Sequence, residues 1–305
     1  MAKRCLLLVP ILVCGIAWSQ TTSGSIAGVI VDAQGAVIQG ASVSALDVEQ
    51  KFTFNTKTDE VGRFVFTQVP PGTYTIKAEQ PGFKKLERPG VVVNANDKLM
   101  IGDLKMEVGQ ATEYVEVSAN AVLLQTESAE RSAALVSKQL ESILVNSRSY
   151  LDLVKLVPGV VSTINLETAG MGGLSNIAAN GNRVNSNQLL INGINNSDTG
   201  SNGSQNVTLS LDSVAEFKML TGVYQAEYGR AMGAQISVVT KSGTSDFHGS
   251  GYWFHRNESM NANNWKNNRD GLPRGLFRFN DQGGTIGGPV LIPKLNKNRD
   301  KLFFF

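Results

Sequence analysis

The sequence predicts a multidomain, mainly β chain: a β-sandwich first, an α+β domain next, and the first strands of a transmembrane β-barrel last. Three observations support this. Residues 21–108 hold short apolar runs between turn signals, residues 121–245 hold a helical pattern followed by strands, and residues 247–257 form an aromatic-rich run about as long as one membrane-spanning strand. The 31 glycines and the 18% of charged residues also fit turn-rich β structure.

Residues 1–19 have the pattern of a secretory signal peptide. The basic pair Lys3 and Arg4 precedes an apolar run, Cys5–Ala17, that is too short to span a bilayer. Small residues at the end of this segment predict cleavage before Gln20. We therefore expect an exported protein.

The cysteines and the net charge exclude several classes of function. A lipoprotein signal would use Cys14, but Val13 ahead of it is too large. Because Cys5 and Cys14 both lie in the signal, the mature chain has no thiol for catalysis, disulfides or metal binding. The formal charge of +2 is carried by Lys3 and Arg4, so the remaining chain sums to zero (+2 minus 2), which gives no electrostatic case for a nucleic-acid partner.

Residues 20–108 are expected to form a β-sandwich, because about seven short strands alternate with turn signals in fewer than 100 residues. The turn signals include Pro70-Pro71-Gly72 and Pro81-Gly82. The expected strands are Ser25–Val31, Ala41–Ala45, Lys51–Thr56, Arg63–Thr67, Gly72–Glu79, Val91–Val93 and Lys98–Glu107.

The runs GVIVDAQGAVIQGASV, TDEVGRFVF and VPPGTYTI resemble carboxypeptidase regulatory-like domains over nearly this whole segment. The resemblance implies a transthyretin-like or prealbumin-like sandwich without catalytic activity, of a kind often grouped with carbohydrate-binding-like folds. Four aromatic residues could form a sugar-stacking surface, but such residues are more often part of the core, and we expect the core for Phe64, Phe66, Tyr74 and Phe83.

Residues 109–120 are expected to be a linker that contains one short strand. Apolar and charged residues alternate in this segment, which is typical of a strand. The strand could equally be the last one of the sandwich or the first one of the next domain. Its core consists of Thr112, Glu113, Tyr114, Val115, Glu116, Val117, Ser118 and Ala119.

Residues 121–161 have a helical pattern. Ser137 is the expected N-cap of a short helix that carries Leu140, Ile143 and Leu144. A second helix, capped by Ser147 or Ser149 and ended by Pro158-Gly159, is expected to face four apolar residues inward: Leu151, Leu153, Val154 and Leu156.

Residues 187–241 are expected to form three strands and a short helix. The apolar run Leu189–Ile191 ends at Asn192-Gly193, a strong turn dipeptide. The second strand should be half-buried, because its residues alternate between apolar and charged: Ala215, Phe217 and Met219 against Glu216 and Lys218. Tyr224 and Tyr228 should share one face of a short helix before the last strand, which is expected to place Ile236 and Val238 on one face.

These landmarks closely resemble the plug domain of TonB-dependent outer-membrane receptors, and the expected plug spans residues 121–245. The string LDLVKLVPGV resembles the Leu-x-x-x-Pro-Gly-Val signature of these plugs. The other matching positions are Arg183, Asn192, Gly193, Glu216, Lys218, Gly222, Tyr228, Gly229 and Lys241. The chain departs from the pattern at Asn192, where Asp is usual, and at Met219-Leu220-Thr221, where an Arg-Gly pair often follows.

The resemblance implies an outer-membrane location with the sandwich in the periplasm, an energising partner, TonB, and contact with outer-membrane lipid. It also implies transport of a ligand that the sequence does not identify: a glycan, a peptide or a chelate. In this family a short extended TonB box lies just ahead of the plug and pairs with TonB by strand addition. Thr112–Ala119 resembles that box.

The polar run that follows Asn192 extends to Gln205. Asp198 and Asn202 suggest a calcium loop, but the twelfth position from Asp198 is Leu209, where such a loop needs Glu. We therefore expect a solvated loop and no metal, and the resemblance implies that it faces the outside.

Residues 246–305 are expected to begin the barrel. The cluster Tyr252, Trp253 and Phe254 suggests an interfacial aromatic girdle. A long external loop is expected at Glu258–Gly271, and further strands are expected at Arg278–Val290 and Leu302–Phe305. Only 60 residues (305 minus 245) follow the plug, whereas a plugged transporter barrel has about 22 strands of about 10 residues each. The sequence is therefore expected to be an amino-terminal fragment of a receptor of the Oar-like branch.

Enzymatic function is not expected, and neither a catalytic residue nor a cofactor is assigned. A catalytic zinc needs about three protein ligands, whereas the chain has two histidines, His248 and His255, which an odd spacing places on opposite faces of a strand. Gly249-Ser250-Gly251 lacks the frame of a hydrolase elbow. The alternative to a transporter is an outer-membrane adhesin or a surface carbohydrate-binding protein that uses the sandwich.

Overall fold

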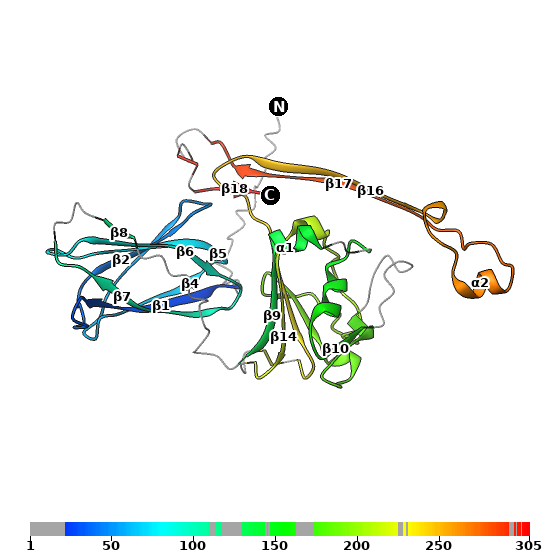
Figure 1. Ribbon diagram of the computed structural model, residues 1–305, viewed down its shortest axis with the longest axis horizontal. Helices are drawn as coiled ribbons and strands as arrows, with labels where there is room; N and C mark the ends of the chain where they lie inside the picture. Colours follow the sequence, from blue (N-terminus) through cyan, green and yellow to red (C-terminus); the bar gives the residue numbers. More distant parts are fainter. Residues whose placement is uncertain are drawn as a thin grey trace, which may run out of the picture.

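The computed structural model describes residues 22–109, 114–116, 130–143, 145, 147–162, 174–224, 228–229, 231–292, 296, 298–299 and 301–305. The expected signal, residues 1–19, lies outside these residues, as do Leu144 and five members of the expected TonB box: Thr112, Glu113, Val117, Ser118 and Ala119. Three parts follow one another along the chain in Figure 1: a two-layered sandwich, a sheet flanked by short helices, and a long hairpin that runs past that sheet.

The sandwich consists of a three-stranded sheet, ordered β4-β1-β7, and a five-stranded sheet, ordered β3-β2-β5-β6-β8. A strand occurs at each of the seven expected positions, because the apolar alternation there matches a face that the other sheet covers. The strands are β1 (Gly24–Asp32), β2 (Ser42–Asp47), β3 (Thr53–Lys57), β4 (Arg63–Val69), β5 (Gly72–Glu79), β6 (Lys85–Val93), β7 (Lys98–Met106) and β8 (Tyr114–Glu116).

Strand β6 is six residues longer than expected at its start. Charged residues and Pro89 hid this extension, but Arg88 is buried and its guanidinium donates to the carbonyl of Ile101 at 2.5 Å. A charged residue therefore occupies a strand position because the opposite sheet offers it an acceptor.

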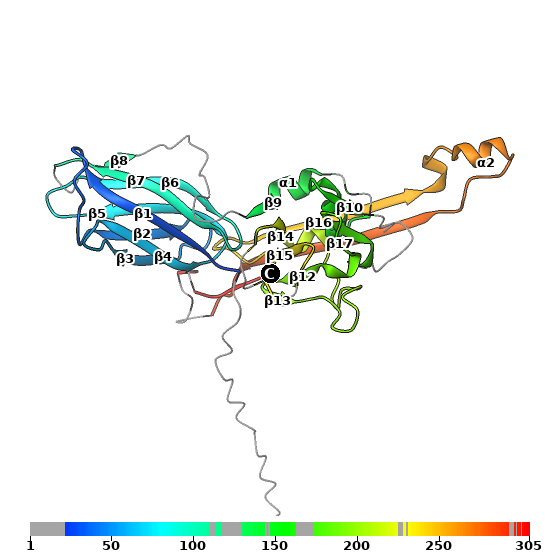
Figure 2. The same cartoon turned by 90° about the horizontal axis from the view of Figure 1, so that it is seen from below.

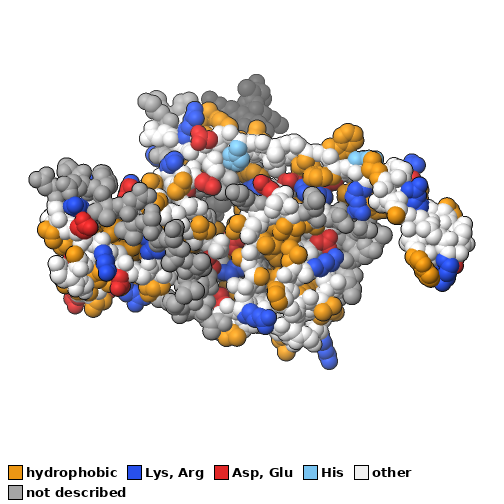
Figure 3. Space-filling model, viewed as in Figure 1, with side chains coloured by type: hydrophobic (Ala, Val, Ile, Leu, Met, Phe, Trp, Pro, Cys, Tyr) orange, Lys and Arg blue, Asp and Glu red, His pale blue; other side chains and the backbone are white. Residues whose placement is uncertain are grey.

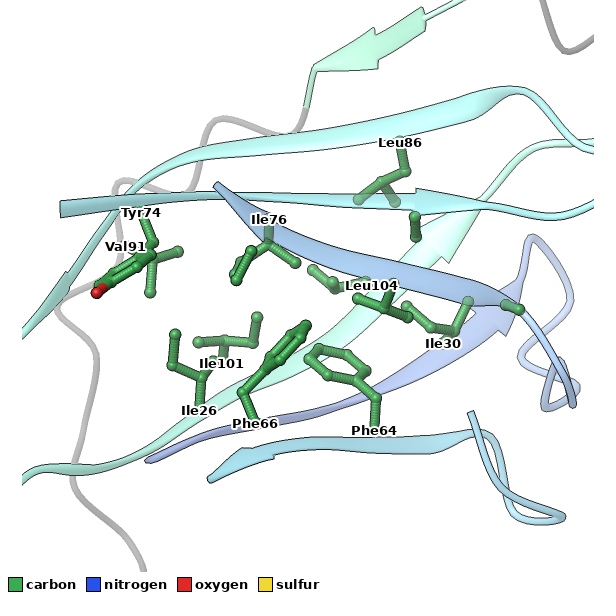
Figure 4. Packing of buried hydrophobic residues seen from close by; sticks show 14 of the residues in the cluster. Ile26, Ile30, Phe64, Phe66, Tyr74, Ile76, Leu86, Val91, Ile101 and Leu104 are labelled. Carbon is green, nitrogen blue, oxygen red and sulfur yellow. The ribbon is translucent and has the colours of Figure 1, made fainter. Parts of the chain in front are cut away.

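The core of the sandwich lies between the two sheets, where large side chains from both meet (Figure 4). Phe64 and Phe66 lie two apart on β4, so both rings point inward and contact each other edge to face with centroids 5.8 Å apart. Tyr74 is buried, and its hydroxyl donates to the carbonyl of Pro70 at 2.8 Å. Phe83 is partly buried against the same cluster. The four aromatic residues therefore belong to the core, as expected, and do not form a sugar-stacking surface.

We expect residues 20–108 to fold on their own, because the core of the sandwich draws on seven strands of this segment. An isolated polypeptide of these residues should unfold in one cooperative transition on heating, followed by circular dichroism. A gradual loss of signal without a transition would show that the sandwich depends on the rest of the chain.

The second part is built on a five-stranded mixed sheet, ordered β13-β12-β15-β14-β9. Its strands are β9 (Arg131–Val136), β12 (Gln188–Ile191), β13 (Ile194–Asn195), β14 (Val214–Gly222) and β15 (Gln235–Thr240). Figures 1 and 2 show helical segments packed on one side of this sheet. The smaller elements are α1 (Ser137–Ser142), η1 (Tyr150–Leu156), β10 (Val160–Ser162), η2 (Leu174–Asn176), β11 (Ile177–Ala179), η3 (Val184–Ser186) and η4 (Leu211–Ser213).

The helical expectation for residues 121–161 is partly wrong. Residues 121–129 lie outside the described residues, and Arg131–Val136 form β9, an edge strand antiparallel to β14. The residues of β14 that pair with β9 lie 80 to 91 positions later in the sequence (216 minus 136, and 222 minus 131), and this pairing overrides the local pattern. The expected short helix is present, but it begins at Ser137, one residue earlier than an N-cap at Ser137 would place it. The N-cap is Val136, and the Ser137 hydroxyl donates to the carbonyl of Ala215 at 2.9 Å.

The second expected helix is η1, a 3-10 helix capped by Ser149, whose hydroxyl accepts from the amide of Leu151 at 3.3 Å. Leu151, Leu153 and Val154 are buried as expected. The expectation for Leu156 is wrong, because that side chain is 56% exposed. Leu156 is in line with the buried Leu153 but is the last residue of η1, where the core that covers the earlier residues ends.

The third part is the hairpin of β16 (His248–Asn257) and β17 (Arg278–Pro289), with the short β18 (Phe303–Phe304) paired to the end of β17. The connection between β16 and β17 contains η5 (Glu258–Met260) and α2 (Trp265–Arg269), at the far tip in Figure 1. Among the described residues no helix combines the length and apolar composition that a membrane span requires.

The expected aromatic girdle is wrong for two of its three residues. Tyr252 and Phe254 point toward the second part of the chain, where both rings contact the guanidinium of Arg148. Trp253, between them, points to the opposite side and is 71% exposed. Successive strand residues alternate faces, so three consecutive aromatic residues cannot share one girdle.

Candidate functional site

The first landmark of the plug-like part is the turn at Asn192-Gly193. It connects β12 to β13, and both residues have positive φ, at 50° and 80°. A two-residue hairpin with positive φ at both positions is the type I′ turn that Asn-Gly favours. The Asn192 side chain also accepts from the amide of Thr240 at 3.0 Å and donates to its hydroxyl at 2.9 Å. The asparagine thus joins the turn to the end of β15.

The charged side chains of β14 are buried, which corrects the expectation of a half-buried strand. Glu216 is 4% exposed and Lys218 is 1% exposed. Both lie on the face of the sheet opposite to Phe217 and Met219, which belong to the apolar core. The cover over these charges comes from the sandwich, more than 100 residues earlier in the chain, so the alternation on β14 alone could not reveal it.

The covering segment is the turn between β6 and β7. Lys218 Nζ donates to the carbonyl of Ala95 and to Asp97 Oδ1, each at 2.8 Å. The Glu216 carboxylate accepts from the amide of the same Ala95, at 2.8 Å and 3.1 Å to its two oxygens. One residue of the sandwich is therefore held through both its N–H and its C=O.

The two carboxylate oxygens of Asp97 bind different partners: one binds Asn94 within the turn, and the other binds Lys218 of β14. Its Oδ2 accepts from the amide of Asn94 at 3.0 Å and from the Asn94 side chain at 2.7 Å, which closes the turn. Its Oδ1 is the atom that pairs with Lys218, and both side chains are 2% exposed. The turn therefore has hydrogen bonds of its own within the sandwich, in addition to those that it makes with β14.

The buried cluster contains two acids and one base. Asp97 is paired directly with Lys218, which leaves Glu216 as the surplus acid. Burial raises the pKa of Glu216 to about 7, although the hydrogen bond from Ala95 and the charge of Lys218 oppose the rise and the charge of Asp97 adds to it. A carboxyl group that titrates near neutral pH is thus placed between two domains.

Three other motif positions lie elsewhere in the plug-like part. Gly222 ends β14. Lys241 follows β15, and its Nζ donates to Glu141 of α1 at 2.9 Å. Arg183 precedes η3 with an exposed side chain. None of these three contacts the buried cluster.

Tyr228 and Gly229 lie beside residues 225–227, which are outside the described residues. The ring of Tyr228 contacts that of Tyr224 edge to face, with centroids 6.2 Å apart. The expected short helix around Tyr224 and Tyr228 is not found at the described residues, because Val223 and Tyr228 lie in bends and Gly229 lies in a turn. A positive φ of 52° at Val223 redirects the chain there.

The described members of the expected TonB box are Tyr114–Glu116. They form β8, which pairs in parallel with Lys85–Glu87 of β6 and ends the five-stranded sheet of the sandwich. Of the two positions that the sequence left open, the backbone therefore takes the last strand of the sandwich.

Arg148 is a functional candidate that the sequence did not indicate. Its guanidinium pairs with Asp212, lies 3.8 Å from Asp281 of β17, and stacks 4.1 Å from the ring centroid of Phe254. Its side chain is 15% exposed. Arg148 thus connects the plug-like part to the hairpin, but no local pattern distinguishes it from a surface arginine.

The described residues contain no cluster of three or more His, Cys, Asp or Glu side chains placed to hold a metal. His248 and His255 lie on opposite faces of β16, and His255 Nδ1 is 2.7 Å from Asn280 Oδ1. Asp198 accepts from the amides of Gly200 and Ser201 of its own loop, at 3.1 Å and 3.0 Å. On the face seen in Figure 3, acidic and basic side chains are interspersed.

Three family models match the chain one after another. Residues 25–107 match the carboxypeptidase regulatory-like domain, residues 125–234 the TonB-dependent receptor plug domain, and residues 239–305 an outer membrane beta barrel domain. The TonB-dependent transporter Oar of Myxococcus xanthus is 26% identical over 302 residues, which is 93% of this chain and 26% of that protein. The chain therefore spans about a quarter of the length of this curated relative.

Among solved structures, the siderophore receptor PirA of Acinetobacter baumannii aligns with 52% of this chain and 22% of its own, at 19% identity and a TM-score of 0.36. A cohesin-X-dockerin complex of Acetivibrio cellulolyticus aligns with 28% of this chain and 58% of its own, at 25% identity and a TM-score of 0.24.

The order of the three matches is the order of the three structural parts: sandwich, plug and the first strands of a barrel. The relation to the Oar transporter runs through all three. This family is not enzymatic. The chain belongs to the TonB-dependent outer-membrane receptors, in the Oar-like group that carries a carboxypeptidase regulatory-like domain ahead of the plug.

Proposed function

We propose that this receptor imports a ligand across the outer membrane with energy supplied through TonB, and that its plug gates the barrel. The observation that carries the proposal is the succession of plug and barrel matches in one chain, with the sandwich match ahead of them. In this proposal the sandwich lies in the periplasm. Residues 1–19 would direct export. The ligand belongs to one of three classes: a glycan, a peptide or a metal chelate.

The alternative, a surface adhesin or carbohydrate binder that uses the sandwich, receives little support from the aromatic residues. Phe64, Phe66 and Tyr74 are in the core and offer no ring face to a sugar. A stacking platform needs exposed aromatic faces. Transport therefore fits the chain better than glycan capture by this domain.

Transport can be tested with a panel of labelled probes: a ferric chelate, a cobalamin, an oligosaccharide and a peptide mixture. Cells that produce the receptor with its complete barrel should accumulate at least one probe, and accumulation should stop when TonB is deleted. If the receptor reaches the outer membrane normally and no probe accumulates in a TonB-dependent way, another ligand class or the adhesin alternative has to be considered.

We further propose that residues 112–119 bind TonB by strand addition. This is supported by the position of β8 at the end of its sheet, because among the described strands β8 pairs with β6 alone. An edge strand presents unpaired N–H and C=O groups to another chain. TonB could thus add a strand beside β8 while β8 stays on the sandwich.

Val115→Pro should weaken binding of the purified periplasmic domain of TonB by about tenfold or more, because proline removes an N–H and fixes φ. Val115→Ala should change the Kd by less than about twofold, because strand addition depends on the main chain. Isothermal titration with the purified receptor gives both values.

The thermal midpoint of the isolated sandwich, extended to residue 120, serves as the control for folding. If Val115→Pro lowers that midpoint strongly, the segment is mainly a structural strand of the sandwich. If Val115→Pro leaves TonB binding unchanged, the segment has no part in energy coupling.

A further inference from the structure

The sandwich contacts the plug at two places, and they differ in character. At the first, the turn between β6 and β7 meets β14 through the buried cluster of Ala95, Asp97, Glu216 and Lys218. At the second, Gln50 Nε2 donates to Ser242 Oγ at 3.0 Å and to the carbonyl of Gly243 at 3.3 Å, and the amide of Ser245 donates to the carbonyl of Glu49 at 3.3 Å. The first contact is buried and charged, whereas the second joins uncharged groups and is partly exposed.

We propose that Glu216 and Lys218 form a docking surface for the sandwich, and that their bonds to Ala95 and Asp97 latch the sandwich to the plug as one body. The role goes beyond ligand transport, because it concerns which domains move together. The partner of this surface is a segment of the same chain, the turn at residues 94–97.

The spacing of the two charges explains why this turn fits. Residues two apart on a strand lie on the same face, about 6 to 7 Å from each other along it. Glu216 meets the N–H of Ala95, and Lys218 meets its C=O, so an acceptor and a donor on the plug match a donor and an acceptor on one residue of the sandwich. The Lys218–Asp97 ion pair then fixes the turn in one register.

Because the contact is buried, losing the charge of either Asp97 or Lys218 should weaken it strongly. A buried ion pair adds little net stability, because desolvation offsets the attraction, but removing one partner leaves a charge without compensation. We therefore expect the hydrogen bonds and the ion pair between the turn and β14 to form together and to break together. The neutral, partly exposed hydrogen bonds of Gln50 contribute less to holding the two domains together.

The proposal can be tested by measuring the separation of the domains in the full chain. No cysteine occurs from Thr22 onward, so Val61→Cys and Val161→Cys supply one label on each domain. These positions are 62% and 65% exposed. Single-molecule energy transfer between the two labels reports the docked fraction in detergent solution.

We expect one narrow transfer peak for the unmodified pair. Asp97→Asn and Lys218→Met should each reduce the ratio of docked to undocked molecules by about 100-fold. The double variant should recover part of this loss, because neither charge of the ion pair is then left without its partner. Gln50→Ala is the control at the second contact, where only neutral hydrogen bonds are lost, and should change the ratio much less, by about tenfold at most.

Asparagine at position 97 still has a side-chain oxygen that can accept from Asn94, so Asp97→Asn preserves the turn. If Lys218→Met disrupts the plug sheet, the test therefore rests on Asp97→Asn. Circular dichroism of each variant shows whether it is folded. A folded Asp97→Asn variant with the unmodified peak would overturn the latch, and so would a loss of docking in Gln50→Ala as large as that in the charge variants. Neither result depends on transport, so the proposed function is tested separately.

Discussion

Phe64→Ala is expected to lower the free energy of unfolding of the isolated sandwich by about 3 to 5 kcal/mol. The Phe64 side chain is 1% exposed and contacts the ring of Phe66. A Cβ at Gly28 would lie 2.8 Å from the Phe64 ring, so the backbone of β1 approaches the ring directly. The backbone of β1 is held by its pairing with β4 and β7 and cannot move into the space that the ring leaves, so the cavity keeps most of its cost.

The same substitution at Phe52 is the control, because that ring is 47% exposed. Phe52→Ala should cost less than about 1 kcal/mol. Urea denaturation of residues 20–108, followed by circular dichroism, gives both values. Equal losses at the two positions would contradict the assignment of Phe64 to the core.

The fold of the sandwich could be predicted from the sequence because its signals are local. Alternation on β4 placed Phe64 and Phe66 on one face, and the turn signals separated the strands at the correct places. The Asn192-Gly193 turn was predictable for the same reason: two adjacent residues tolerate the positive φ values that the type I′ geometry requires.

The cover over β14 could not be predicted in this way. Glu216 and Lys218 alternate with apolar residues in the manner of a solvated strand face, and only a turn of another domain makes that face an interior. The helical pattern around residues 131–136 failed for a related reason, since β9 gains its hydrogen bonds from β14. In both cases a distant partner decides the environment of a short segment.

Arg148 illustrates a third limit. Its importance comes from Asp212, Asp281 and the ring of Phe254, which meet it from three different segments. The family motifs around it concern backbone turns and strand patterns, and they do not mark a side chain whose partners are assembled by the fold. A prediction from single positions therefore finds the scaffold and misses the contacts between its parts.

The stability of the docked plug should fall as the pH rises from about 4.5 to about 7, and Glu216 should be the cause. The pKa of this carboxyl is raised to about 7 in the folded chain, from a reference value of 4.5, mainly because it is buried. Between these values the folded chain keeps a proton that the unfolded chain has lost. Fewer protons bound in the unfolded state make stability decrease with pH.

The rise of the pKa from 4.5 to about 7 corresponds to roughly 3 kcal/mol of stability, all of it lost by about pH 8. Glu216→Gln is the matched variant, because glutamine can accept from the amide of Ala95 but cannot ionise. Subtracting the variant's stability from that of the unmodified chain removes every other titrating group. Chemical denaturation of the full chain at steps from pH 4.5 to 8, followed by circular dichroism, should show this difference fall steadily across the range. A difference that stays constant with pH would mean that Glu216 is not the group that titrates between the sandwich and the plug.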